Sequence, residues 1–418
     1  MAITGRADGP PLGPPDGLVA GLQRSAAVIR QRSALLGEPL EVDAVALLGE
    51  RAAVGGLTRR SPTSCGGATR LVRAADGWLA VALPRPEDLE LLPAWLGIDA
   101  RDAGDAVDRG APWAAVEAAL GRRGAREAAE RAWMLGLPVS QLPQVPGAAA
   151  TTPPLAPPPL APLPVLATPV PSRVPDLRPL GDMTVIDLSS LWAGPLCGNL
   201  LSLAGADVVK VESTTRPDGS RADPRRFFDV LNGGKRSVAL DLAGADGWRV
   251  LRRLLAAADV VIEGSRPRAL EQRGIVATEL VANAGPRVWV SITGHGRTGA
   301  GRDRVAFGDD AAVAGGLVVA DDAGPCFCAD AAADPAAGLV AAAACLDALA
   351  VGGRWLVDVA MAGVAASLAG PTLGPDPDRP VDGPAAEVAP PRARAAAAPG
   401  PALGEHTAEV LAGLGVAP

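Results

Sequence analysis

The stretch MTVIDLSSLWAGPLCGNLLSLAGADVVKVE, residues 183–212, decides the fold class of this chain. It begins with a short β-branched run, MTVIDLS, passes into an apolar segment of helical length, PLCGNLLSLAG, and ends in a second β run, ADVVKVE. Further β runs follow at KRSVALDL, DVVIEGS and RVWVSITG, with the helical run WRVLRRLLAAA between two of them. Strands that alternate with helices at this spacing predict an α/β fold with a parallel sheet covered by helices.

Ligands of parallel α/β sheets bind at the carboxyl ends of the strands. The segments just after the predicted strands are therefore candidates for a binding site. They are Ser189 to Gly194, Glu212 to Arg221, Glu263 to Arg268, and Gly294 to Arg297.

The composition excludes several classes of function. The net charge of −7 argues against a general nucleic-acid binder, so any basic site must be local. The five cysteines are scattered without a CxxC pair and there are two histidines, so we expect neither a metal site nor a disulfide framework. The first residues lack a basic head before an apolar run, and Pro and Gly interrupt the apolar stretches. We therefore expect no secretory signal, no membrane span and a cytoplasmic location.

Two proline-rich segments divide the chain, because dense proline is incompatible with helices and inner strands. The first block reads as a small α/β unit, and the second contains the alternating strands and helices. The predicted order is a disordered N-terminus (1–17), a small α/β domain (18–145), a linker (146–175), a catalytic domain (176–370), a Pro/Ala-rich loop (371–402) and a C-terminal helix (403–418).

The loop LNGGKRSVALDL, residues 231–242, places two glycines and two cations immediately before a strand. Gly233 and Gly234 let a ligand approach the backbone, and Lys235 and Arg236 suit phosphate oxygens. Composition alone fits a solvated charged loop equally well.

The turn SSLWAGPLCG after the first strand contains GxxxG and not GxGxxG. Glu212 ends the second strand, where a ribose-binding acid would lie, but the missing glycine disfavours a nicotinamide-dependent oxidoreductase. The loop SITGHGRTG carries His295 between two glycines. These glycines indicate a backbone that either moves or fits closely around another group.

Asp334 stands before Pro335 at the start of an alanine-rich helical run. Local rules predict Asp334 as the N-cap and proline as the first helical residue. The positive end of the helix dipole favours the ionised carboxylate, which is also the form that a carboxylate nucleophile needs. The structural and the catalytic interpretation are compatible.

Five motifs in order resemble the family III CoA-transferases, which include formyl-CoA transferase, carnitine CoA-transferase and the 2-methylacyl-CoA racemases. They are VIDLSSLWAGPLCGNLLSLAGADVVKVE, LNGGKRSVALDL, VIEGSRPRALEQRG, SITGHGRTG and ADPAAGLVAA. CGGATRLVRAADGWLAVAL, in the first block, resembles the family's small domain, which normally follows the large one. The segment order in this chain is therefore rearranged.

The resemblance implies a Rossmann-like CoA-binding large domain, a smaller α/β domain, and a homodimer with no permanent cofactor. It implies that acyl-CoA and a carboxylic acid are the substrates and that Asp334 is the nucleophile. The CoA-contacting positions it implies are Trp192, Ala193, Arg221, Leu231, Asn232, Gly233, Gly234, Lys235, Arg236, Gly264, Ser265, Arg266, Gly294, His295 and Gly296.

Two positions depart from the family pattern. Phe307 stands where racemases carry a histidine, so α-proton exchange loses one of its two partners and a racemase is disfavoured. Trp192 stands where formyl-CoA transferase has glutamine, so formyl or oxalyl specificity is not supported. A family member that binds CoA without catalysis is a further alternative, given the rearranged order.

Overall fold

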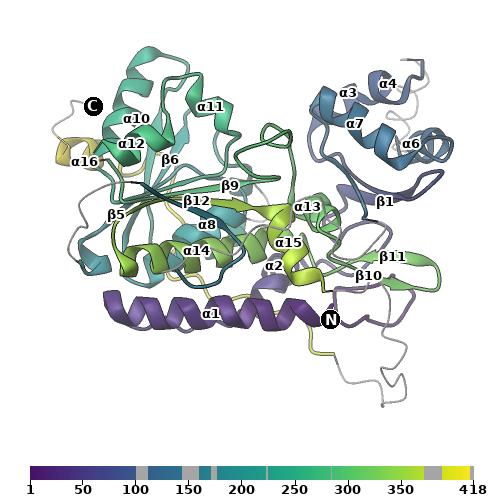
Figure 1. The fold of residues 1–418 in the computed structure, drawn as a ribbon, viewed down its shortest axis with the longest axis horizontal. Coiled ribbons are helices and arrows are strands. Elements are labelled where there is room, and N and C mark those ends of the chain that lie inside the picture. Colours follow the sequence, from purple (N-terminus) through teal and green to yellow (C-terminus); the bar gives the residue numbers. More distant parts are fainter. Residues whose placement is uncertain are drawn as a thin grey trace.

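The computed structural model describes residues 1–99, 112–143, 160–170, 177–222, 225–283, 285–370 and 388–414. A seven-stranded sheet forms the centre of the molecule (Figure 1). Its strands, in spatial order, are β4 (Leu166–Val170), β12 (Arg354–Ala360), β9 (Val288–Thr293), β8 (Val260–Glu263), β5 (Thr184–Asp187), β6 (Asp207–Ser213) and β7 (Arg236–Leu240). All neighbours pair in parallel except β4, which is antiparallel to β12.

Numbered along the chain, the six parallel strands have the order 3-2-1-4-5-6 across the sheet. This is the order of doubly wound dinucleotide-binding sheets, in which the crevice for a ligand lies where the strand order reverses. Here the reversal lies between β5 and β8. The predicted α/β class with a parallel sheet is confirmed.

Both faces of the sheet are covered, because successive side chains of a strand point to opposite sides. In β5, Val185 joins the core on one side and Ile186 the core on the other. One core contains α1 (Asp16–Leu36), α8 (Ala193–Leu203), α14 (Ala333–Val351) and α15 (Met361–Ala369). The opposite core contains α10 (Ala245–Ala257), α11 (Pro267–Glu271), α12 (Ala277–Ala282) and α16 (Thr407–Gly413).

Helix α14 is the centre of the first core. Among the described residues it is the helix that is long and apolar enough to cross a membrane, but 83% of its most apolar window is buried inside the structure. It is therefore packed as the core helix of a globular fold. Helix α1 lies along the side of α14 that faces away from the sheet (Figure 1).

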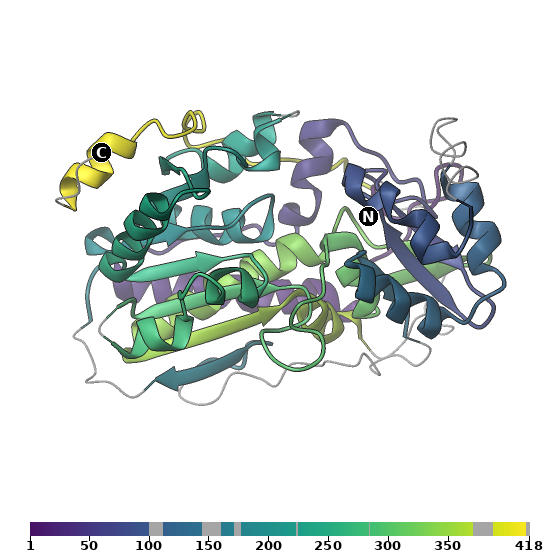
Figure 2. The ribbon, with the colours of Figure 1, turned by 90° about the horizontal axis from the view of Figure 1, so that it is seen from above.

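A smaller unit lies at one end of the molecule, and the C-terminal helix lies at the other (Figure 2). The smaller unit has an antiparallel sheet with the strand order β1-β2-β3. It comprises β1 (Thr69–Arg73), β2 (Trp78–Ala82), β3 (Val139–Gln141), α3 (Pro86–Glu90), α4 (Leu92–Leu96), α6 (Pro112–Leu120) and α7 (Ala125–Leu135). Leu71 and Ala80 of this sheet pack on α13 (Gly308–Ala314) and on the hairpin β10 (Val318–Asp321) and β11 (Gly324–Phe327).

Three predicted boundaries need correction. Residues 1–17, expected to be disordered, include the buried Ile3 and Thr4, and Arg6 pairs with Asp321. Residues 18–145 are not one unit, because α1 and α2 (Glu50–Gly55) pack on the large domain. The expected linker 146–175 contains β4, an edge strand that tolerates Pro169 because it has a neighbour on one side only. The remainder of that linker and residues 371–387 lie outside the described residues.

The structure also contains four short helical segments that connect these parts. They are η1 (Ala46–Gly49), η2 (Leu180–Asp182), η3 (Gly219–Arg221) and α9 (Arg225–Asn232).

Candidate active site

The loops after β5 and β8 meet at the point where the strand order reverses. A Cβ atom built on Gly264, after β8, lies 3.5 Å from the Cβ of Ser189, after β5. The β5 loop continues through Leu191, whose φ of 70° is left-handed, to Trp192, the N-cap of α8. The structure thus brings together the loop that leads to Trp192 and the loop that begins at Gly264, which are far apart in the sequence.

The helix that carries Asp334, α14, packs on the start of α8. Gly338, one turn further along α14, packs so closely on α8 that an added Cβ would lie 2.5 Å from the carbonyl oxygen of Ala193. Asp334 is the second residue of α14, and its N-cap is Ala332. The prediction of Asp334 as N-cap was therefore wrong: the helix begins one residue before it and includes Pro335 in its first turn.

The Asp334 carboxylate is half-buried and accepts a hydrogen bond from the Gly308 backbone N–H. Gly308 is required for this contact, because a Cβ there would collide with Asp334 Oδ2 and would lie 2.5 Å from the carbonyl oxygen of Ala331. Burial raises the pKa of Asp334 to about 7; Asp309 and Asp330 act in the same direction, and Arg51 and the Gly308 N–H oppose them. The sequence predicted that the helix terminus favours the ionised carboxylate, but in the structure desolvation has the larger effect and favours the protonated form.

Two further carboxylates and one cation surround Asp334. Asp330 is fully buried and accepts two hydrogen bonds from Arg51, at 2.9 and 2.6 Å. Asp309 accepts a hydrogen bond from the Ala331 N–H at 3.1 Å, and burial raises its pKa, with Asp330 adding to the effect. Sequence reasoning missed Arg51 and Asp309, and it assigned no role to Asp330.

The loop LNGGK is mostly buried. Lys235 is 3% exposed and donates to Asp187, Asn232 and the carbonyl oxygen of Pro195, at 2.8 to 2.9 Å. Burial alone would raise the pKa of Asp187, but Lys235 and Lys210 bring it below its usual range. These groups form an internal network that fixes the loop.

Three other members of this loop have different surroundings. Leu231 is a core residue, Gly234 is exposed, and Gly233 faces the chain itself, because a Cβ there would collide with the carbonyl oxygen of Ala398. The two glycines predicted that another group comes close to the backbone of this loop. At Gly233 that group is the C-terminal segment, at Ala398.

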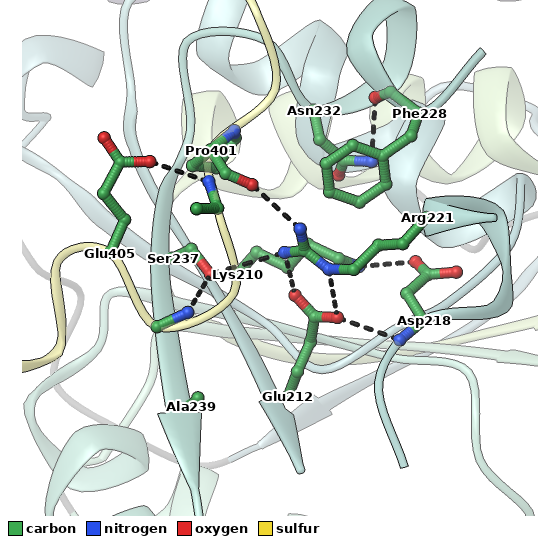
Figure 3. Close-up of polar contacts among 12 residues, drawn as sticks. Lys210, Glu212, Asp218, Arg221, Phe228, Asn232, Ser237, Ala239, Pro401 and Glu405 are labelled. Carbon is green, nitrogen blue, oxygen red and sulfur yellow. Dashed lines mark hydrogen bonds and ion pairs between the residues drawn. The ribbon is translucent and has the colours of Figure 1, made fainter. Parts of the chain in front are cut away.

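Arg221 is also engaged within the chain (Figure 3). It donates to Glu212 at 2.9 and 2.5 Å and to the carbonyl oxygen of Pro401 at 2.8 Å, and it stacks on Phe228. Arg236 pairs with Asp207. Both predicted cations therefore hold the β6–β7 edge together in this structure.

Three exposed arginines, Arg216, Arg266 and Arg268, follow the ends of β6 and β8. Arg266 is exposed, and its pKa is lowered by partial burial and then by Arg268, with smaller contributions from Arg85 and Arg216. Arg268, Arg85 and Arg216 are therefore near enough to Arg266 to affect its pKa, while Arg85 is bonded to Asp88 and Arg268 pairs with Asp303. Arg85 belongs to the small unit, so the arginine group (Arg85, Arg216, Arg266, Arg268) spans both parts of the molecule.

The loop after β9 contains the remaining predicted positions. Gly294, His295 and Gly296 are half-buried, and burial followed by the charge of Arg304 lowers the pKa of His295 to about 3. His295 is therefore neutral at physiological pH. Phe307 is the N-cap of α13, and its ring lies 5.8 Å from the Arg85 guanidinium.

Comparison with known proteins identifies the family of this chain. The model of CoA-transferase family III matches residues 180–399. The chain is 35% identical over 147 residues to succinyl-CoA–D-citramalate CoA-transferase of Chloroflexus aurantiacus, covering 34% of this chain and 37% of that protein. It is 36% identical over 145 residues to succinate–glutarate CoA-transferase of Agrobacterium fabrum, covering 32% of this chain and 36% of that protein.

Formyl-CoA:oxalate CoA-transferase of Escherichia coli is 32% identical over 124 residues, covering 28% of this chain and 30% of that protein. Among solved structures, a CAIB/BAIF family protein from Brucella suis is 31% identical, with a TM-score of 0.42 over 46% of this chain and 55% of that one. The match spans about a third of the length of these curated relatives. The family match covers more than half of the residues: the chain belongs to CoA-transferase family III.

Proposed function

We propose that this chain transfers coenzyme A from an acyl-CoA thioester to a carboxylic acid, with Asp334 as the covalent nucleophile. Family membership and the CoA-transferase names of its relatives support the reaction class. The observation that carries the proposal is the position of Asp334, a half-buried carboxylate that accepts a hydrogen bond from Gly308 in the first turn of α14, the helix that packs on the start of α8.

The first half of the reaction loads the enzyme with CoA. An Asp334 carboxylate oxygen attacks the thioester carbonyl carbon, the C–S bond breaks, and CoA leaves as the thiolate. The product is a mixed anhydride between the acyl group and Asp334. The thiolate then attacks the aspartyl carbonyl carbon, which releases the donor acid and forms an enzyme–CoA thioester.

The second half runs the same steps with the acceptor acid. The acceptor carboxylate attacks the aspartyl thioester, and CoA thiolate leaves as a second mixed anhydride forms. Attack of the thiolate on the acceptor's carbonyl carbon yields acceptor-CoA and regenerates the Asp334 carboxylate. Each step exchanges one acyl bond for another, so no oxidant or external proton source is needed.

Binding of CoA is assigned to two groups of residues in this proposal. In the arginine group (Arg85, Arg216, Arg266, Arg268), the exposed Arg216, Arg266 and Arg268 supply charge for the phosphates, and the half-buried Arg85 is bonded to Asp88. Trp192, Ala193, Gly264 and Ser265 stay assigned to CoA contact, and the loop with Gly294, His295 and Gly296 stays assigned to the surroundings of the thioester. We assign Asn232 and Lys235 to fixing their loop, because their polar groups bond within the chain. A homodimer and a cytoplasmic location belong to the same proposal.

The test is to trap the acylated enzyme. Purified protein is incubated with a panel of acyl-CoA thioesters and then with hydroxylamine, and peptide mass spectrometry locates the hydroxamate. We expect it on Asp334, with none in Asp334→Asn. The matched control Asp246→Asn changes an aspartate on α10 whose side chain is 90% exposed, and it should trap as well as the natural protein. Undiminished CoA transfer by Asp334→Asn would refute the assignment.

A non-catalytic CoA-binding role is the second candidate, and the segment order favours it. The small unit with β1, β2 and β3 precedes the strands of the large sheet in the chain, which is a rearranged order for the family. Binding of CoA in calorimetry without exchange of labelled CoA into any acid of a broad panel would favour this role over transfer.

A further inference from the structure

The turn before α14 has an unusual backbone. Ala329 and Ala331 have φ values of 57° and 46°, in the left-handed region that residues with a Cβ avoid. Asp330 lies between them, and Asp334 follows at the second position of the helix. Such a conformation persists when the surrounding structure holds it. The contacts that hold this turn therefore also place Asp334.

Most of those contacts come from the N-terminal part of the chain. The Thr4 hydroxyl accepts from the Ala329 N–H at 2.9 Å, and the Ser61 hydroxyl accepts from the Phe327 N–H at 3.0 Å. Arg51, on α2, donates two hydrogen bonds to Asp330. Because two hydrogen bonds join the Arg51 guanidinium to the Asp330 carboxylate, they fix the direction of this carboxylate as well as its position.

Arg51 is itself held on two sides. Its guanidinium lies 5.3 Å from the ring of Trp192, which is 2% exposed and meets Phe227 edge to face at 5.0 Å. On another side, Gly66 leaves room for the guanidinium, because an added Cβ would lie 3.1 Å from Arg51 Nη2. Arg51 therefore connects the turn before α14 with the loop after β5.

The charges around Asp334 give Arg51 a second effect. Asp309 on α13 and Asp330 in the turn are acidic neighbours of Asp334, and Arg51 acts on all three carboxylates. Asp310 follows Asp309 and is bonded to Phe307 and Ser140. On α8, which also packs against α14, burial raises the pKa of Cys197 well above its usual range, so that thiol is uncharged.

We propose that Arg51 is a positioning residue for Asp334. Through its pair with Asp330 it holds the left-handed turn that orients the nucleophile, and its charge offsets the acidic neighbours that would keep the nucleophile protonated. The proposal rests on the role of Asp334 in the proposed function. It identifies a residue from the block before the sheet as part of the site, within the same chain.

If Arg51 had only a structural role, replacing it would affect folding and would leave the ionisation of Asp334 unchanged. The test therefore follows the Asp334 carboxyl by ¹³C NMR as a function of pH, with Asp334→Asn supplying the assignment by difference. This readout needs no substrate. It separates the outcome for Arg51 from the outcome for acyl transfer: a confirmed shift without trapping by any acyl-CoA would leave Arg51 in place and overturn the proposed function.

Three variants form a cycle. Arg51→Gln removes the cation and should move the Asp334 midpoint upward by about one pH unit or more. Asp330→Asn removes a neighbouring anion and should move it downward. The double variant should return close to the natural value, because both charges of the pair are gone. An unchanged midpoint in Arg51→Gln, or shifts of the same sign in both single variants, would overturn the proposal.

Arg51→Lys separates charge from geometry. Lysine keeps the charge but cannot form the two parallel bonds. The midpoint should stay near that of the natural protein, while hydroxylamine trapping slows by about tenfold or more because the turn loses its fixed orientation. If Arg51→Gln does not fold, this variant and the double variant carry the test. Trapping at the natural rate in Arg51→Lys would contradict the positioning role.

Discussion

At neutral pH the candidate nucleophile is near its midpoint of ionisation, because burial raises the pKa of Asp334 to about 7. A carboxylate with a raised pKa is a stronger base and a better nucleophile than an ordinary one, but a smaller fraction of it is ionised below pH 7. The environment of Asp334 therefore links reactivity with a dependence on pH in the physiological range.

The first prediction is an acid limb near pH 7. A raised pKa means that Asp334 loses its charge as the pH falls through 7, so the rate of single-turnover acylation should fall about tenfold per pH unit below that value. Asp310 is the control, because burial raises its pKa to about 7 as well. Asp310→Asn should keep the limb. A limb near pH 4 would contradict the assigned environment of Asp334.

The second prediction concerns Gly308. An added methyl group would collide with Asp334 Oδ2 and would lie 2.5 Å from the carbonyl oxygen of Ala331. Gly308→Ala should therefore displace the carboxylate and slow hydroxylamine trapping by about 100-fold, with the fold intact by circular dichroism. In the matched variant Gly181→Ala, the new methyl group has no neighbour within 4 Å, and trapping should be unaffected. Equal trapping by both variants would refute the role of Gly308.

Among single residues, the sequence predicted a role in the site for Asp334 and did not predict one for Arg51. Asp334 has a local signature, an aspartate before a proline at a helix start, and it lies in an ordered set of motifs. Arg51 has no such signature, because it reaches the site through the packing of α2, far from α14 in the sequence. A pair of residues separated by this distance along the chain has no local pattern.

Among the elements, α14 does most to position the site. It packs between the sheet and α1, and its second turn abuts α8, where Gly338 allows contact with the Ala193 carbonyl oxygen. The distance between these two helices sets the distance between Asp334 and the loop after β5. A change at their contact should therefore affect stability and chemistry together.

The third prediction is a substitution at this contact. Gly338→Ala would bring a methyl group 2.5 Å from the Ala193 carbonyl oxygen and should lower the free energy of unfolding by about 2 kcal/mol. Chemical denaturation measures the change. Gly413→Ala, in α16, is the control, because its methyl group meets nothing within 4 Å and should cause no loss. Equal stability of the two variants would show that α14 and α8 are less closely packed than described.

The strands that could be predicted from the sequence are those that are buried on both faces of the sheet. The runs at β5, β6, β8 and β9 are rich in Val and Ile, because helices cover both faces of the sheet, and all were predicted, although β6 also contains the buried Lys210. Strand β4 was missed because Pro169 and its neighbouring prolines resemble a linker. The pairing of β10 with β11 was missed because that short hairpin takes its stability from the small unit that packs on it.

In the whole molecule, segments from both ends of the described chain meet around α2. Glu50 is fully buried and accepts hydrogen bonds from Arg394 at 2.6 and 3.0 Å, and Arg394 also donates to Asn199 of α8 at 3.1 Å. The next residue is Arg51, which pairs with Asp330. The C-terminal segment thus supports the helix that carries Arg51.

The fourth prediction tests this connection. Arg394→Ala would leave Glu50 buried without its cation and should lower the free energy of unfolding by about 3 kcal/mol. Arg392→Ala is the matched control, because its pair with Asp43 is largely exposed and should contribute less than about 1 kcal/mol. Denaturant titration of both variants measures the difference, and equal losses would refute the supporting role of Arg394.

The arrangement of the parts could not be predicted beyond their order. The sequence indicated that a small-domain-like segment precedes the sheet, and the boundaries assigned to that segment were wrong because α1 and α2 pack on the large domain. Amphipathic helices have similar patterns whichever domain they cover. The surroundings of the site therefore had to be read from three-dimensional contacts such as those of Arg51.

The central claim is that Asp334 exchanges acyl bonds with both acids, and an oxygen label tests it most directly. An acceptor acid with ¹⁸O in its carboxylate attacks the aspartyl thioester, and its oxygen stays with Asp334 when CoA thiolate attacks the acceptor's carbonyl carbon. Mass spectrometry of the Asp334 peptide after turnover should therefore find ¹⁸O in the Asp334 carboxylate. Acceptor-CoA formed with no label in that peptide would contradict the account.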